Sequence, residues 1–234
     1  MSNTKNRFVH INQRIDQAFK ASGRSLQDPV TLLAVSKRHS LDKIETLYQL
    51  GQRNFGESYL QEALQKISHC THSDIIWHFI GPIQSNKTKE IARNFQWIHS
   101  VDRVKIARRL SSQHPLDAPP LNICLQINIS QEAQKSGFSI AEINTVISEI
   151  ISLPNLVVRG LMAIPRQVPD QNFEQQRQAF HQLRELMQQL NQEFKLNMDT
   201  LSMGMSGDLE AAIAEGATII RVGTALFGER DSGK

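Results

Sequence analysis

Eight short strand-like stretches recur along this chain, most of them rich in aliphatic and β-branched residues, and helical patterns follow them. The stretches cover residues 31–35, 53–55, 75–80, 97–101, 121–129, 157–164, 200–203 and 218–222. The helical patterns lie near residues 41–50, 58–68, 85–93, 103–112, 139–152, 172–190 and 208–215, with a short helix after the last stretch. Eight strand–helix alternations are the number that closes a (β/α)₈ TIM barrel, an α/β fold that typically needs about 250 residues. The 234 residues of this chain come close to that length.

A doubly wound open sheet is the alternative fold, although five or six strands are more usual there. The shortest stretch, at residues 53–55, is the weakest of the eight strands. An amphipathic helix precedes the first strand, with Phe8, Ile11, Ile15 and Phe19 at three- and four-residue steps and Gly23 as a stop. No linker rich in Pro, Gly or Ser divides the chain, so we expect one domain over residues 1–234.

Charge and hydropathy restrict the classes of partner. The net charge is only +3 and the basic residues are scattered, which argues against a nucleic-acid-binding protein. No apolar stretch approaches the roughly 20 residues of a membrane span, and no secretory signal opens the chain. The two cysteines, Cys70 and Cys124, read as reduced thiols. We therefore expect a cytoplasmic protein with no nucleic-acid or membrane partner.

Glycine-rich turns follow the seventh and eighth strands. Gly204, Ser206 and Gly207 come after the seventh, and Gly223 and Thr224 after the eighth. Glycine allows close backbone approach, and exposed N–H groups at a helix start favour an anion. Because phosphate sites after strands seven and eight recur in this fold, the two turns indicate a phosphate site. A tight turn with a Ser or Asp helix cap would produce the same sequence.

Lys37 follows the first strand, which is the neighbour of the eighth in a closed barrel. An amine beside a phosphate site suggests a Schiff base with a phosphorylated carbonyl compound, either a sugar phosphate or pyridoxal 5′-phosphate (PLP). The alternative is a solvated loop lysine. Lys135, after the fifth strand, is interpreted as such a loop charge, with transient receipt of PLP as the alternative.

Arg221 shares a strand face with Gly223 and is expected to point into the barrel. A buried guanidinium needs a partner. The pyridine nitrogen of PLP is one candidate, and an inward carboxylate such as Glu57 is the other.

Other polar residues carry weaker signals. His69 and His72 flank Cys70 but lack a second ligand pair, so no metal site is expected. His78, on the third strand, is interpreted as a hydrogen-bonded core histidine. The only tyrosines, Tyr48 and Tyr59, fall in helical patterns and are assigned to packing.

Longer stretches of sequence carry a family resemblance. They are Leu33-Ala34-Val35-Ser36-Lys37, Asn54-Phe55-Gly56-Glu57, Trp77-His78-Phe79-Ile80-Gly81-Pro82-Ile83-Gln84-Ser85-Asn86-Lys87, Lys135-Ser136-Gly137, Arg159-Gly160-Leu161-Met162-Ala163-Ile164-Pro165, Leu201-Ser202-Met203-Gly204-Met205-Ser206 and Arg221-Val222-Gly223-Thr224-Ala225-Leu226-Phe227-Gly228. Through them the chain resembles the PLP homeostasis proteins, whose barrel is like the N-terminal domain of alanine racemase. The resemblance extends from about Leu32 to Arg230.

The resemblance implies PLP held as an aldimine on Lys37, with Arg221 near the pyridine nitrogen. It also places three residues at the phosphate: Ser206, Gly223 and Thr224. The sequence departs from the family at two positions. Ser58 stands where the family usually has Asn near the PLP ring hydroxyl, which puts that contact in doubt. Gly207 stands where an acidic residue is common, and we expect backbone N–H groups to bind phosphate there.

Three functions remain open, because the barrel hosts many chemistries. The first is a monomeric, non-catalytic protein that buffers PLP and delivers it to apo-enzymes. The second is a PLP-dependent amino-acid racemase, which needs a base on each face of the substrate carbon. The tyrosine that supplies the second base in alanine racemase belongs to an added C-terminal domain not evident in this sequence. The third is a Schiff-base aldolase. We favour the first.

Overall fold

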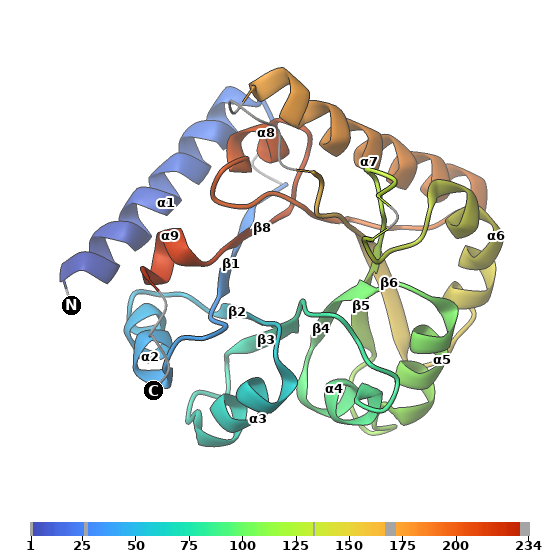
Figure 1. Cartoon of the computed structure of the whole chain (residues 1–234), viewed down its shortest axis with the longest axis horizontal. Coiled ribbons are helices and arrows are strands. Elements are labelled where there is room, and N and C mark those ends of the chain that lie inside the picture. The colour runs from blue at the N-terminus through green and yellow to red at the C-terminus, as the bar shows by residue number, and fades with distance from the viewer. Residues whose placement is uncertain (1, 26–27, 133, 167–171, 230–234) are drawn as a thin grey trace.

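The computed structural model describes residues 2–25, 28–132, 134–166 and 172–229. Its eight strands form one closed parallel barrel in the order β1 to β8, with helices around the outside (Figure 1). The strands are β1 (Thr31–Val35), β2 (Asn54–Glu57), β3 (Ile76–Phe79), β4 (Trp97–Val101), β5 (Leu121–Gln126), β6 (Leu156–Met162), β7 (Thr200–Ser202) and β8 (Ile219–Val222). The helices are α1 (Ser2–Ala21), α2 (Leu41–Gln49), α3 (Leu60–His69), α4 (Thr88–Asn94), α5 (Val104–Gln113), α6 (Ile140–Ile151), α7 (Phe173–Phe194), α8 (Leu209–Ala214) and α9 (Thr224–Phe227).

Pairing of the first strand with the last closes the barrel. β1 and β8 run parallel in a register from Thr31 opposite Ile219 to Ala34 opposite Val222. The predicted (β/α)₈ fold is therefore confirmed, and the open-sheet alternative is wrong. The weakest expected strand is also present, shifted so that β2 covers Asn54–Glu57.

The largest difference from the predicted elements lies after β5. The apolar run was expected to continue as a strand to residue 129, but β5 ends at Gln126. Ile127 instead makes an isolated parallel bridge with Phe138. The Asn128 side chain donates to the carbonyl oxygens of Glu132 at 2.8 Å and Lys135 at 3.2 Å. These side-chain hydrogen bonds stabilise a loop where further strand pairing of β5 was expected.

The amino-terminal helix α1 is longer than its apolar stripe suggested and packs against α8 and α9 (Figure 1). Ile11 and Ile15 are its buried face. Gly23 follows it at φ +66°, a left-handed conformation that ends the helix as the sequence predicted.

The apolar core lies between the strands and the surrounding helices, whereas polar side chains occupy much of the barrel interior. Outward residues such as Phe55, Phe79 and Ile98 belong to the outer core. The inward residue His99 of β4 hydrogen-bonds Ser202 of β7 at 2.7 Å. Because β4 and β7 are not neighbours in the barrel, this contact crosses the interior. Branched apolar residues usually dominate that space.

Cys70 and Cys124 are both free thiols, as predicted. Among the described residues, no helix has the length and apolar character needed to cross a membrane.

Candidate functional site at the carboxyl ends of the strands

The loop after β7 is a preorganised turn. The Met205 N–H donates to Asp208 Oδ1 at 2.6 Å, and the Asp208 N–H donates to the Met205 carbonyl oxygen at 3.2 Å. Gly204 sits at φ +91°, where an added Cβ would lie 2.5 Å from the Ala212 Cβ. Arg14 of α1 holds the loop from outside through a 3.0 Å hydrogen bond to the Ser206 carbonyl oxygen. Backbone and side chain therefore both fix the shape of this turn.

Unused backbone donors gather at the ends of β7 and β8. Four N–H groups donate no hydrogen bond to any described residue, namely those of Ser206, Gly207, Gly223 and Thr224. The two loops are joined, because the Arg221 N–H donates to the Gly204 carbonyl oxygen at 3.0 Å. A set of free N–H groups on adjacent loops suits an anion with several oxygens, such as a phosphate.

Arg221 points into the barrel and is 5% exposed. Its Nη1 donates to the Ser202 carbonyl oxygen at 2.5 Å and the Ser202 hydroxyl at 2.8 Å, and its Nη2 donates to the Ala163 carbonyl oxygen at 2.9 Å. A guanidinium has five N–H donors, so about two are left for a ligand. Burial lowers the pKa of Arg221 to about 10, and the Asp208 carboxylate opposes part of that shift. The group therefore remains protonated at neutral pH.

The proposed ion pair between Arg221 and Glu57 is wrong. Glu57 faces outward from β2, where its Oε1 accepts hydrogen bonds from the Ser36 hydroxyl at 2.6 Å and from Lys66 Nζ at 2.7 Å. Lys66 of α3 also donates to the Ser36 carbonyl oxygen at 2.8 Å. Burial raises the pKa of Glu57, and the Lys66 ammonium opposes that shift. This buried pair supports the strand end from which Lys37 emerges.

Lys37 lies just beyond β1, partly buried, with Arg38 next to it at φ +62°. Its amine makes no hydrogen bond or ion pair with any described residue. Leu33 pairs in register with Arg221, so the end of β1 lies beside the end of β8. The topology thus brings the Lys37 backbone to the same barrel mouth as the unused N–H groups.

Ser58 follows β2 at the same mouth and lines a cavity of about 430 Å³ with Asp102, Arg103 and Ser136 among others. Lys135 also lies at this end, where its Nζ donates to the Ile164 carbonyl oxygen at 3.2 Å and pairs with Glu132 at 2.6 Å. These contacts tie the loop after β5 to the loop after β6.

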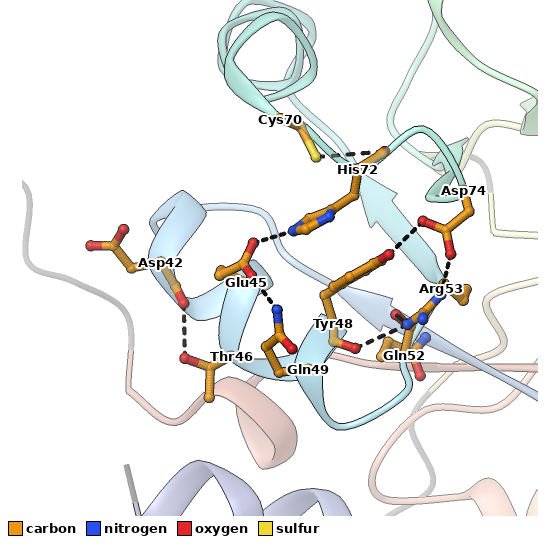
Figure 2. A network of polar contacts seen from close by, with 10 residues as sticks. All are labelled: Asp42, Glu45, Thr46, Tyr48, Gln49, Gln52, Arg53, Cys70, His72 and Asp74. Carbon is orange, nitrogen blue, oxygen red and sulfur yellow. Dashed lines mark hydrogen bonds and ion pairs between the residues drawn. The ribbon is translucent and has the colours of Figure 1, made fainter.

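Several polar residues noted in the sequence lie away from this mouth. Tyr48 stacks on His72 with ring centroids 3.6 Å apart. Its hydroxyl donates to Asp74 at 2.7 Å, one of the dashed contacts in Figure 2. His72 contacts Glu45 at 2.5 Å, and Arg53 pairs with Asp74 at 2.6 Å. Because Arg53 and Asp74 precede β2 and β3, this network lies at the opposite end of the barrel.

A cavity of about 640 Å³ also opens at that opposite end, lined by Thr31, Trp97, Arg159, Asp199 and others. It is larger than the cavity at Ser58, but it lies at the amino ends of the strands, where barrel enzymes do not place their chemistry. Its arginines are paired within the protein, for example Arg159 with Asp199 at 2.5 Å. We assign this face to stability.

Sequence reasoning missed three polar residues near the site, namely Lys66, His99 and Ser202. His99 and Ser202 have inward positions on their strands, and strand alternation could have placed them there. Lys66 belongs to a helical pattern, in which a lysine is ordinarily solvated. The structure buries it against Ser36 and Glu57, which lie at the ends of β1 and β2.

The fold and the donors at its mouth define a barrel of the kind that alanine racemases carry at their amino end. A family model described as "Alanine racemase, N-terminal domain" matches residues 13–231. More particularly, the chain belongs to the pyridoxal phosphate homeostasis proteins. It is 52% identical to the member from Pseudomonas aeruginosa, covering 100% of this chain and 98% of that one. It is 43% identical to the Escherichia coli K12 member, with 100% of both chains covered.

Solved structures agree with this assignment. PipY of Synechococcus elongatus with PLP bound is 36% identical at a TM-score of 0.79, covering 92% of this chain and 100% of PipY. PipY without PLP is similar at a TM-score of 0.84. An alanine racemase from Clostridium difficile is only 11% identical, at a TM-score of 0.76, and this chain covers 58% of it. That last likeness concerns the fold alone.

Proposed function

We propose that this protein binds PLP at the carboxyl-end mouth of its barrel and holds it as an aldimine on Lys37. The observation that carries the proposal is the set of four unused N–H groups beside the inward Arg221. They suit the phosphate, while the remaining guanidinium donors suit the pyridine nitrogen. Ser58 would approach the ring hydroxyl from β2. Its side chain is shorter than the asparagine usual in the family, which leaves room for water.

The protein's role would be to buffer PLP and deliver it to apo-enzymes, without substantial catalysis. Membership of the PLP homeostasis family and the similarity to PLP-bound PipY support a role in PLP handling. A racemase needs a second base opposite Lys37. Tyr48 is held by Asp74 at the other end of the barrel. Tyr59 is exposed and lies against Arg38, whose guanidinium carbon is 5.3 Å from the ring centroid.

Further parts of the proposal concern the setting of the protein. We expect one PLP-binding domain that acts as a monomer in the cytoplasm, with apo PLP enzymes as its recipients and no nucleic-acid partner. Lys135 remains a loop charge in this proposal, since Glu132 pairs with its amine. Transient receipt of PLP by Lys135 would first require that pair to open.

The test combines transfer and turnover. Holo-protein is mixed with a PLP-free enzyme whose recovered activity is followed, and a matched sample is assayed for exchange between D- and L-alanine. We expect recovery of the apo-enzyme and no racemase turnover in the usual enzyme range of about 1–10³ s⁻¹. Turnover in that range would contradict the non-catalytic carrier and support the racemase. Failure to reactivate a panel of apo-enzymes would remove the delivery role.

A further inference from the structure

A line of polar side chains crosses the barrel interior from β2 to β8. His78 Nε2 lies 3.0 Å from Asn54 Oδ1, and His78 Nδ1 lies 2.9 Å from His99 Nε2. His99 Nδ1 lies 2.7 Å from the Ser202 hydroxyl, which accepts from Arg221 Nη1 at 2.8 Å. The residues come from five strands, so only the closed barrel brings them together.

Both histidines in this line are neutral. Burial lowers the pKa of His78 to about 3. Burial also holds the pKa of His99 well below its usual value, and repulsion from the Arg221 cation lowers that pKa further. A neutral imidazole has one N–H and one acceptor nitrogen. Charge on either ring would also place a second cation near the buried guanidinium.

Neutrality of the rings and the Asn54 oxygen that faces His78 Nε2 give the line one direction. His78 uses its only N–H at Nε2 to donate to Asn54 Oδ1, so its Nδ1 accepts from His99 Nε2–H. His99 Nδ1 then accepts the Ser202 hydroxyl proton. Every proton has an acceptor, and the Ser202 oxygen keeps its lone pairs for Arg221.

Simple core packing does not account for this arrangement. His114 is also buried, but its two nitrogens contact the backbone carbonyl oxygens of Ala92 and Pro119, each at 2.9 Å. Both of these partners of His114 are backbone groups. His78 and His99 instead contact each other and two polar side chains, in space that barrels ordinarily fill with aliphatic residues.

We propose that His78 and His99 are positioning residues that orient Arg221 through Ser202, so that the guanidinium presents its remaining N–H groups to the barrel mouth. This inference rests on the proposed function, because the group that Arg221 would contact at the mouth is the ring nitrogen of PLP. The orientation of Arg221 itself is a property of the protein alone. It can therefore be measured without the cofactor.

The first experiment uses ligand-free wild-type protein and histidine ¹⁵N NMR. Both rings are expected to stay neutral in the Nε2–H tautomer from about pH 5 to pH 8, across the ordinary histidine pKa of about 6.5. Rotation of the Arg221 guanidinium about its Nε–Cζ bond is expected to be slow. Titration of His99 near its ordinary pKa, or mixed tautomers, would overturn the proposal. This outcome is independent of PLP binding.

The second experiment compares three variants. His99→Phe removes the acceptor of the Ser202 hydroxyl proton, so guanidinium rotation should accelerate and PLP affinity fall by about fivefold to tenfold, the effect of one hydrogen bond. His99→Asn keeps an acceptor near the Nδ1 position and should restore most of that loss. His114→Phe, a matched loss of a buried histidine, should change neither property.

The outcomes separate the two proposals. Unchanged rotation and affinity in folded His99→Phe would overturn the positioning role even where PLP binds well. A change of the same size in His114→Phe would also overturn it, because the effect would then be general destabilisation. A wild-type protein that binds no PLP contradicts the proposed function, while the NMR measurements still decide the orientation of Arg221.

Discussion

The backbone N–H of Arg221 on β8 donates a 3.0 Å hydrogen bond to the carbonyl oxygen of Gly204 in the loop after β7. This bond joins the residue proposed for the pyridine ring to the loop proposed for the phosphate. The groups proposed to contact the phosphate and the pyridine ring of the cofactor would thus belong to two hydrogen-bonded backbone segments. A change at Gly204 should therefore weaken both sets of contacts.

Gly204→Ala is expected to destabilise the protein. The residue sits at φ +91°, and the new Cβ would lie 2.5 Å from the Ala212 Cβ and 2.8 Å from Ile220 Cδ1. We expect a loss of about 1–3 kcal/mol in the free energy of unfolding, measured by urea denaturation. Gly207→Ala is the control for stability, because nothing lies within 4 Å of its added Cβ. Equal stability of the two variants would contradict the assigned strain.

Lys37→Ala is expected to abolish the visible absorption band of the aldimine, because it removes the amine. Reduction of wild-type holo-protein with borohydride, followed by digestion, should leave the pyridoxyl group on Lys37. Lys89→Ala, an exposed lysine on α4, should keep the band. A pyridoxyl group found only on another lysine would refute the assignment.

Ser206→Ala is expected to weaken PLP retention by about tenfold, since a hydrogen bond to a charged group contributes about 1.5–3 kcal/mol. The backbone N–H of residue 206 survives the change, so binding should be reduced and not lost. Pyridoxal, which lacks the phosphate, should bind the wild-type protein far more weakly than PLP in an equilibrium titration. Equal affinities for PLP and pyridoxal would contradict the proposed phosphate site.

Stability should fall as the pH is lowered, because both barrel histidines are neutral in the native state. The unfolded chain protonates them near pH 6.5, whereas burial lowers the pKa of His78 to about 3 and that of His99 well below normal. Their contribution is thus complete above about pH 6.5 and declines below it, by about 1.4 kcal/mol per pH unit for each histidine. Urea denaturation at several pH values should show a shallower slope for His99→Phe. An unchanged slope would mean that His99 binds a proton in the native protein as readily as in the unfolded chain.

Lys66→Met is expected to destabilise the protein by about 3–5 kcal/mol, because it leaves the buried Glu57 carboxylate without its cation. Glu57 is fully buried and Lys66 is 7% exposed. Adding Glu57→Gln to this variant removes the unpaired charge and should recover much of the loss. Thermal unfolding of the single and double variants measures this, and a double variant no more stable than Lys66→Met would argue against the charge as the cause.

The sequence by itself determined the barrel. Eight alternations of strand and helix period are local patterns, and eight is the number of parallel strands that closes a (β/α)₈ barrel. The sequence also placed Lys37, Arg221 and the two glycine turns at strand ends. Their residue types and positions follow from chain order and from the twofold alternation of strands, without knowledge of distances.

Only the tertiary structure decided which groups those residues meet. Glu57 was one of two candidate partners for Arg221, but it faces outward from β2, where its Oε1 accepts a hydrogen bond from Lys66 of α3. The contact between His99 and Ser202 spans 103 positions of sequence and crosses the barrel between strands that are not neighbours. Local patterns contain no information about such a contact. It exists because closure of the sheet brings inward side chains from opposite walls within hydrogen-bonding distance.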